Sequence, residues 1–198
     1  MADPRDLQEV VSALPATPFF FLRHGETDWN KNRLAQGQTD IPLNEVGRDQ
    51  ASLATPLLVG HSITKLVSSP LSRAYETAEI VNRALSLPIE RHSGLMERGF
   101  GRAEGQPWTS GFVESDLGEG SENVSEFRNR IILALSEMLT RYPGPLLIVS
   151  HGGVYGAYAE ILGGLSGARA PNSVPFRFDP PGVQSSRWRI TPVDPVRI

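Results

Sequence analysis

The chain has 198 residues, 39% of them hydrophobic and none cysteine, which favours one domain over residues 1–198 and excludes a disordered chain, disulfides and cysteine chemistry. Its 19 basic and 22 acidic residues give a formal net charge of −3, so it lacks the basic excess of nucleic-acid-binding proteins. Its apolar runs are too short to span a bilayer and its charged N-terminus predicts no secretory signal, so we expect a cytoplasmic protein without a membrane partner.

The first segments along the chain predict a lead-in, a strand and a helix. Residues 1–18 form a polar lead-in with a short helix, and the continuous apolar run Phe19–Leu22 is typical of a buried strand. Apolar residues recur at helical spacing over residues 44–59, and Asn44 is a suitable N-cap for that helix. The chain is therefore expected to enter its core as a strand and to return along a helix.

The middle of the chain begins with a second short strand at Leu66–Ser69. Ser69 and Pro70 have the chemistry of an N-cap and a first helical residue, so a helix is expected to start there. Residues 92–120 are rich in glycine and polar groups and show no clear period, which predicts a long loop. A loop of that length in a compact domain is often functional.

The last third of the chain predicts a helix over residues 121–142, a third buried strand at Leu146–Ser150 and an apolar helix ending near Leu162. Two more strands are expected at residues 174–178 and 187–191. Because strands and helices alternate, we predict an α/β fold, with a three-layer α/β/α sandwich around a mainly parallel sheet.

Polar reactive residues follow the three buried strands. Arg23 and His24 follow the first strand, Arg73 lies one turn into the helix after the second, and His151 follows the third. Because ligands of a parallel sheet bind beyond the carboxyl ends of its strands, these side chains are expected to converge on one site. Two guanidinium forks and two imidazoles suit a tetrahedral phosphate dianion, with one imidazole as a nucleophile.

Sequence blocks around these residues resemble those of the histidine phosphatase superfamily, the phosphoglycerate-mutase-like proteins. In chain order the blocks are Leu22-Arg23-His24-Gly25-Glu26-Thr27 with Trp29-Asn30, Gly37-Gln38-Thr39-Asp40-Ile41-Pro42-Leu43 with Gly47, Ser68-Ser69-Pro70-Leu71-Ser72-Arg73-Ala74, Leu95-Met96-Glu97 with Glu104-Gly105, and Ser150-His151-Gly152-Gly153. The resemblance covers roughly residues 19–180 and implies a phosphoglycerate-mutase-like fold. Ala103 departs from it, because relatives often carry an aromatic residue there.

The resemblance also implies roles for individual residues. His24 would form a phosphohistidine, and Glu97 would protonate the leaving oxygen and then activate water, with Glu104 as the rival acid. The residues implied to hold the phosphoryl group or substrate are Arg23, Asn30, Gln36, Gly37, Arg73, His151 and Gly152. No metal and no cofactor is expected, because guanidinium and imidazole groups already supply the positive charge.

The sequence favours a phosphatase that hydrolyses a small phosphate monoester. The alternative is a phosphoglycerate mutase, which needs further cations for the second anionic group of its substrate, whereas residues 103–127 carry six acidic residues and no lysine or arginine. Arg98 and Arg102 lie just upstream and weaken this contrast. A non-catalytic binder of phosphorylated ligands is a third hypothesis. Trp108 and Phe112, in the loop over residues 92–120, are candidates for a wall of the substrate pocket. Neither the substrate nor assembly as a homodimer can be read from the sequence.

Overall fold

A central sheet of six strands organises the computed structural model, which describes residues 4–108, 117–183 and 185–194. The strands are β1 (Phe19–Arg23), β2 (Lys65–Ser68), β3 (Ile89–Arg91), β4 (Leu146–Ser150), β5 (Pro175–Asp179) and β6 (Arg189–Pro192). They lie in the order β3-β2-β4-β1-β5-β6, where β3, β2, β4 and β1 are parallel and β5 is antiparallel to both its neighbours. The predicted mainly parallel sheet is therefore confirmed.

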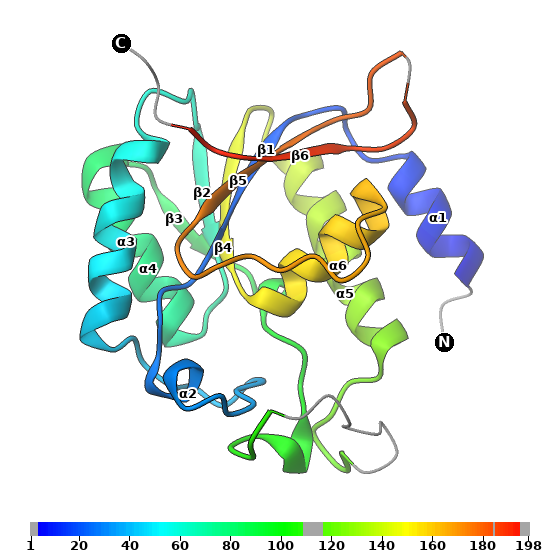
Figure 1. Ribbon diagram of the computed structural model, residues 1–198. Coiled ribbons are helices and arrows are strands. Elements are labelled where there is room, and N and C mark those ends of the chain that lie inside the picture. Colours follow the sequence, from blue (N-terminus) through cyan, green and yellow to red (C-terminus); the bar gives the residue numbers. More distant parts are fainter. Residues whose placement is uncertain (1–3, 109–116, 184, 195–198) are drawn as a thin grey trace.

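Helices cover both faces of the sheet (Figure 1). The α-helices are α1 (Pro4–Ser12), α2 (Asp28–Lys31), α3 (Glu45–Leu58), α4 (Ser72–Leu85), α5 (Val124–Arg141) and α6 (Gly152–Gly163), and the 3-10 helices are η1 (Ser93–Leu95) and η2 (Gly101–Ala103). Helices α3 and α4 pack on one face of the sheet, while α1, α5 and α6 lie on the other. The predicted three-layer sandwich is confirmed.

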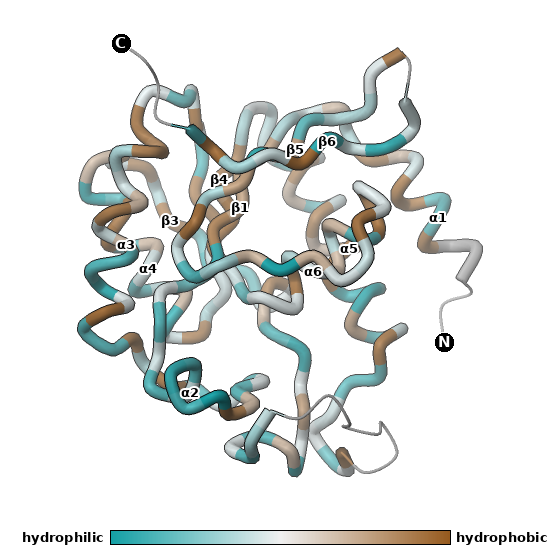
Figure 2. Tube along the Cα trace, viewed as in Figure 1, coloured by the Kyte–Doolittle hydropathy of each residue, from teal (hydrophilic) through white to brown (hydrophobic). Residues whose placement is uncertain are grey.

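The central strands carry apolar residues at every position because both faces of the sheet are covered. Phe19 and Phe21 point into the cluster formed with α5 and α6, whereas Phe20 and Leu22 point into the cluster formed with α3 and α4. Figure 2 shows hydrophobic residues gathered along the central strands, while α2 is mostly hydrophilic. The apolar run that predicted β1 thus serves two separate cores.

The start of α4 corrects the sequence prediction. Its N-cap is Leu71, which has no side-chain capping bond, and its first residue is Ser72 rather than Pro70. The carboxylate of Asp40 accepts hydrogen bonds from the Ser72 amide and hydroxyl, each at 2.7 Å, so a distant residue satisfies the helix terminus. Ser69 accepts from the Leu71 amide outside the helix, and its hydroxyl proton is left for another partner.

The segment between α4 and α5 contains more structure than its composition predicts. Strand β3 was not expected, because the sequence Ile-Glu-Arg is short and polar at the sheet edge, where a strand needs no continuous apolar run. Two 3-10 helices interrupt the described part of the loop over residues 92–120. Phe112 lies outside the described residues. Within the ranges that the structure describes, no helix is long and apolar enough to cross a membrane.

Candidate active site

Three neighbouring strands, β1, β4 and β2, bring their following residues to one end of the sheet. Arg23 pairs in register with Ser150, and the His24 amide continues this pairing by donating to the Ser150 carbonyl at 2.9 Å. The Ser69 amide donates to the Val149 carbonyl at 3.0 Å. The rings of His24 and His151 consequently lie with their centroids 5.2 Å apart. The structure therefore brings the residues that follow these strands together.

His24 presents a neutral imidazole with a defined free nitrogen. Its Nδ1 lies 2.7 Å from the Gly25 carbonyl oxygen, which can only accept, so Nδ1 carries the proton and Nε2 holds the lone pair. Burial, together with the positive charges of Arg73 and Arg23, holds the pKa of His24 well below its usual range. The Asn172 side chain donates to the His24 carbonyl at 2.8 Å and fixes the turn. A neutral ring with a free lone pair is the nucleophilic form of histidine.

The Arg73 guanidinium is completely buried and held by backbone carbonyls. Its Nη1 donates to the Thr39 carbonyl at 2.9 Å, and its Nη2 donates to the Gly37 carbonyl at 2.7 Å. Burial lowers the pKa of Arg73 to about 10, and the negative charge of Glu97 opposes this shift. Arg73 therefore remains cationic at neutral pH in a fixed orientation. The Gly37 carbonyl thus orients Arg73, while the role of Gly37 as a substrate contact stays a prediction.

Three buried nitrogen atoms around His24 have no hydrogen-bond partner among the described residues. They are Arg23 Nε, Arg73 Nε and His151 Nδ1. Arg23 is anchored by the bond from its Nη1 to the Ala170 carbonyl at 2.9 Å, while His151 Nε2 lies 2.8 Å from the Ser69 hydroxyl. Because buried donors normally find partners, such a cluster indicates a place for a ligand with several acceptor oxygens.

Glu97 lies at the N-terminus of α6. Its Oε2 accepts from the Gly153 amide and its Oε1 from the Arg98 amide, both at 2.9 Å. Its negative charge acts on both Arg23 and Arg73, so the carboxylate stands beside the buried cations. A carboxyl group in this position can exchange a proton with a ligand held by those cations.

Glu104, the rival acid, has a different environment. Its Oε1 accepts from the amides of Gln38 and Phe100, each at 3.0 Å, and its Oε2 accepts from the Thr39 amide at 2.9 Å and the Thr39 hydroxyl at 2.5 Å. Each Glu104 oxygen accepts two hydrogen bonds, so Glu104 acts as a clamp on the loop whose carbonyls hold Arg73. Each Glu97 oxygen accepts only one from the described residues, which leaves room for a proton and favours Glu97 over Glu104 as the acid.

The remaining predicted contact residues surround this cluster in different ways. Asn30 Oδ1 accepts a hydrogen bond from the Thr27 backbone amide at 3.2 Å in the capping box of α2, and it lies 3.5 Å from the side-chain Nδ2 of Asn172. Gln36 is buried, and its Oε1 has no partner within the described part of the chain. Gly152 packs against Arg23, because an added Cβ would lie 3.4 Å from the guanidinium carbon. Their roles toward a substrate stay predictions.

Three residues of the site were not identified from the sequence as functional: Ser69, Gly153 and Asn172. Asn172 has no sequence signal, because it comes from the irregular segment between α6 and β5. Ser69 was expected to cap α4, and the second glycine after His151 was read only as part of a motif. Trp108 is 50% exposed and packs edge-on against Phe100, with centroids 5.2 Å apart.

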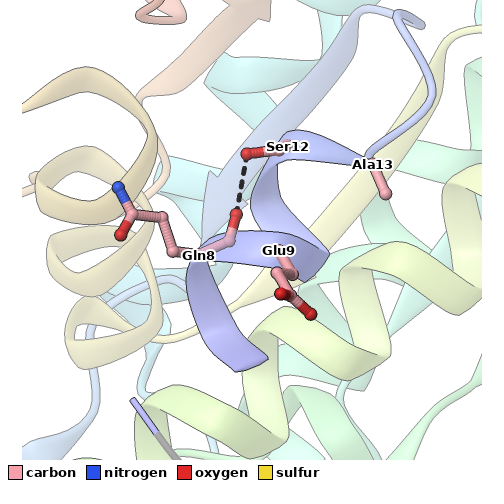
Figure 3. Close-up of a pocket in the computed structure, with 4 residues that line it drawn as sticks. All are labelled: Gln8, Glu9, Ser12 and Ala13. Carbon is pink, nitrogen blue, oxygen red and sulfur yellow. Dashed lines mark hydrogen bonds between the residues drawn. The ribbon is translucent and has the colours of Figure 1, made fainter. Parts of the chain in front are cut away.

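Two hollows elsewhere on the described surface lack comparable chemistry. Figure 3 shows a shallow hollow on α1 lined by Gln8, Glu9, Ser12 and Ala13, where the Ser12 hydroxyl donates to the Gln8 carbonyl of the same helix at 2.8 Å. A second hollow, which includes His61 and Arg177, lies where β1 begins, at the far end of that strand from His24. Among the described residues, no group of three or more His, Asp or Glu side chains is placed to hold a metal ion.

Comparison with known proteins identifies relatives of the chain. The family model of the histidine phosphatase superfamily (branch 1) matches residues 19–175. The uncharacterized phosphatase PhoE of Bacillus subtilis is 36% identical over 182 residues, which cover 88% of this chain and 92% of that protein. A probable phosphoglycerate mutase, GpmB of Yersinia enterocolitica, is 34% identical over 161 residues, 74% of each chain. A solved mycobacterial glucosyl-3-phosphoglycerate phosphatase with VO3 has a TM-score of 0.75 at 26% identity, covering 89% of this chain and 98% of that chain.

Proposed function

Because the chain belongs to the histidine phosphatase superfamily, branch 1, we propose that it is a phosphatase that hydrolyses small phosphate monoesters through a phosphohistidine on His24. The observation that carries the proposal is the set of three unpartnered buried nitrogens, on Arg23, Arg73 and His151, beside a neutral imidazole. A phosphoryl group supplies the oxygens that these nitrogens lack, and its phosphorus is the atom that a free lone pair on His24 can attack.

The first step transfers the phosphoryl group to His24. Its Nε2 forms a bond to phosphorus while the bond from phosphorus to the ester oxygen breaks. The leaving oxygen takes a proton from the Glu97 carboxylic acid, which becomes a carboxylate. Arg23 and Arg73 bind the equatorial oxygens, where negative charge spreads in the transition state. The Gly25 carbonyl accepts from Nδ1 and stabilises the positive charge that the imidazole acquires.

The second step releases phosphate and restores the enzyme. The Glu97 carboxylate takes a proton from a water molecule, whose oxygen attacks the phosphorus of the phosphohistidine. The bond from phosphorus to Nε2 breaks, so His24 recovers its lone pair and Glu97 its proton. Because the same carboxyl group serves both steps, its position next to the buried cations is needed throughout the cycle.

Two arginines beside Glu97, Arg98 and Arg130, are already engaged with Glu122, which favours hydrolysis over mutase activity. Arg98 donates through Nε to the Glu122 carbonyl at 2.8 Å, and Arg130 forms an ion pair with the Glu122 carboxylate at 2.6 Å. These arginines therefore hold the loop rather than a second anionic group of a substrate. The mutase remains the second candidate, because the relatives include a probable phosphoglycerate mutase and a solved phosphoglycerate mutase from Thermus thermophilus with a TM-score of 0.71.

A panel of phosphate monoesters tests the proposal. An aryl phosphate, hexose phosphates, 3-phosphoglycerate and a glycosylated phosphoglycerate are incubated with the protein, and both phosphate release and phosphoglycerate isomerisation are measured. We expect phosphate release that is abolished in His24→Ala and retained in the control His61→Ala, because His61 packs on Phe20 next to the hollow where β1 begins. Unchanged hydrolysis in His24→Ala refutes the phosphohistidine, and isomerisation without hydrolysis establishes the mutase.

A further inference from the structure

The Ser69 hydroxyl lies directly against the imidazole of His151. Its Oγ is 2.8 Å from Nε2, and both residues are completely buried. The same Oγ accepts a hydrogen bond from the Leu71 amide at 3.3 Å. The other imidazole nitrogen, Nδ1, is buried and has no partner among the described residues. The two ring nitrogens of His151 therefore have unequal environments.

The hydrogen bonds of Ser69 determine where the proton of His151 resides. A hydroxyl has one proton to donate, and a buried hydroxyl that cannot donate it is destabilised. If Nε2 carried the ring proton, Ser69 Oγ would accept from both Nε2 and the Leu71 amide, and its own proton would find no acceptor among the contacts of the described chain. If Ser69 donates to Nε2, every hydrogen bond of the hydroxyl is satisfied. The ring proton then resides on Nδ1.

We propose that Ser69 is a positioning residue that fixes His151 as the tautomer protonated at Nδ1, so that the Nδ1–H group donates a hydrogen bond to a phosphoryl oxygen. The part of this proposal that concerns the phosphoryl oxygen rests on the proposed function. Ser69 itself contacts no substrate in this arrangement and acts only through His151.

The charges around His151 agree with a neutral ring. Burial and the positive charge of Arg73 hold the pKa of His151 well below its usual range, with smaller contributions from His24, Arg23 and Arg130. A ring that cannot take a second proton needs the correct tautomer in order to donate. Both histidines of the site are then the tautomer protonated at Nδ1. His24 presents the lone pair of Nε2 to the ligand, whereas His151 presents its Nδ1–H group.

Nitrogen NMR of the full-length protein tests the tautomer directly. Two-bond proton–nitrogen correlations of 15N-histidine-labelled protein distinguish Nδ1–H, Nε2–H and doubly protonated rings, and the spectrum of His151→Asn assigns the His151 signals. We expect the Nδ1–H pattern both in the free protein and with inorganic phosphate. An Nε2–H or a doubly protonated His151 in the free protein overturns the proposal.

Variants separate the positioning role from a packing role. In Ser69→Ala we expect mixed tautomers and a kcat lowered about tenfold with KM changed less than about threefold, as loss of one hydrogen bond predicts. Ser69→Thr keeps a hydroxyl and is expected to restore the Nδ1–H pattern. Ser150→Ala is the matched control, because it removes an equally buried hydroxyl that donates to the Leu95 carbonyl rather than to His151.

The outcomes distinguish this inference from the proposed function. If Ser69→Ala keeps the Nδ1–H pattern and loses only stability, Ser69 is a packing residue and the inference is wrong even though the enzyme still hydrolyses phosphate esters. If the wild-type protein shows the Nδ1–H pattern but hydrolyses no phosphate ester, the proposed function is wrong and the assignment of the tautomer stands.

Discussion

Replacing Gly153 with alanine moves the proposed acid without touching the nucleophile. A Cβ atom at this position overlaps the Glu97 Oε1 atom and lies 3.0 Å from its Cδ. Gly153 is the second residue of α6 and has no positive φ, so the backbone accepts alanine without strain. The carboxylate must therefore shift, and we expect it to move away from the α6 N-terminus and lose the hydrogen bond from the Gly153 amide to Oε2.

The two effects of Gly153→Ala on stability nearly cancel. Alanine in a helix stabilises by up to about 1 kcal/mol relative to glycine. The lost bond from the Gly153 amide to Glu97 costs about 1 kcal/mol. We therefore expect a change in the free energy of unfolding close to zero. Catalysis responds differently, because a positioned general acid contributes roughly a hundredfold or more to the rate.

The assay compares leaving groups of different basicity. An alkyl phosphate needs a proton on its leaving oxygen, so we expect its kcat/KM, which reports transfer of the phosphoryl group to His24, to fall roughly a hundredfold in Gly153→Ala. The nitrophenolate of a nitrophenyl phosphate leaves as a stable anion, so kcat/KM for that ester is expected to fall less than about tenfold. Steady-state kinetics on the two esters, with thermal unfolding as the measure of stability, gives both quantities.

Gly156→Ala is the matched control for this prediction. It adds the same methyl group one turn further along α6, where the nearest atom is the Ala168 carbonyl oxygen at 3.3 Å rather than a site residue. We expect it to keep the activity toward both esters. Equal losses of kcat/KM toward both esters in Gly153→Ala, or no loss of kcat/KM toward the alkyl ester, would refute the assignment of Glu97 as the acid.

Three further predictions follow from single contacts. Glu104→Gln places the protons of a side-chain amide against the backbone amides that now donate hydrogen bonds to Glu104. We expect the free energy of unfolding in denaturant to fall by about 1–3 kcal/mol, and KM to rise because the loop that holds Arg73 is no longer fixed. An unchanged KM would contradict this dependence of Arg73 on Glu104. Folding lowers the pKa values of His24 and His151 below the value of about 6.5 that histidine has in an unfolded chain. Below about pH 6.5 the unfolded state therefore binds more protons than the folded state. The free energy of unfolding is then highest above that pH and falls by about 1.4 kcal/mol per pH unit for each histidine as the pH drops below it. His24→Asn is expected to remove one such contribution in unfolding titrations, and an unchanged slope would refute it. Ser86→Gly relieves the left-handed residue that ends α4 (φ 53°) and is expected to raise the unfolding free energy by about 1 kcal/mol, with no change in activity as the check on specificity.

The sequence predicted the secondary structure correctly where the spacing of its apolar residues favours one kind of element. The apolar runs at Phe19–Leu22 and Leu146–Val149 predict β1 and β4, because runs this short and rich in aromatic or branched residues are typical of strands covered on both faces. The helical period over residues 121–142 predicts α5 for the same reason, since it needs one apolar face. Strand β3 and the start of α4 were missed because a neighbouring strand and the Asp40 carboxylate decide them.

For the site, the sequence by itself determined which residue types follow the strands, and parallel strands bring such residues to one end of a sheet. The resemblance already favoured Glu97 over Glu104, but only the tertiary structure supplied a physical reason, because the difference lies in which donors surround each carboxylate. The tertiary structure alone brought Asn172 to the His24 carbonyl. The physical reason is that periodicity records which side chains avoid water, whereas the protonation and orientation of polar groups depend on partners that are distant in sequence.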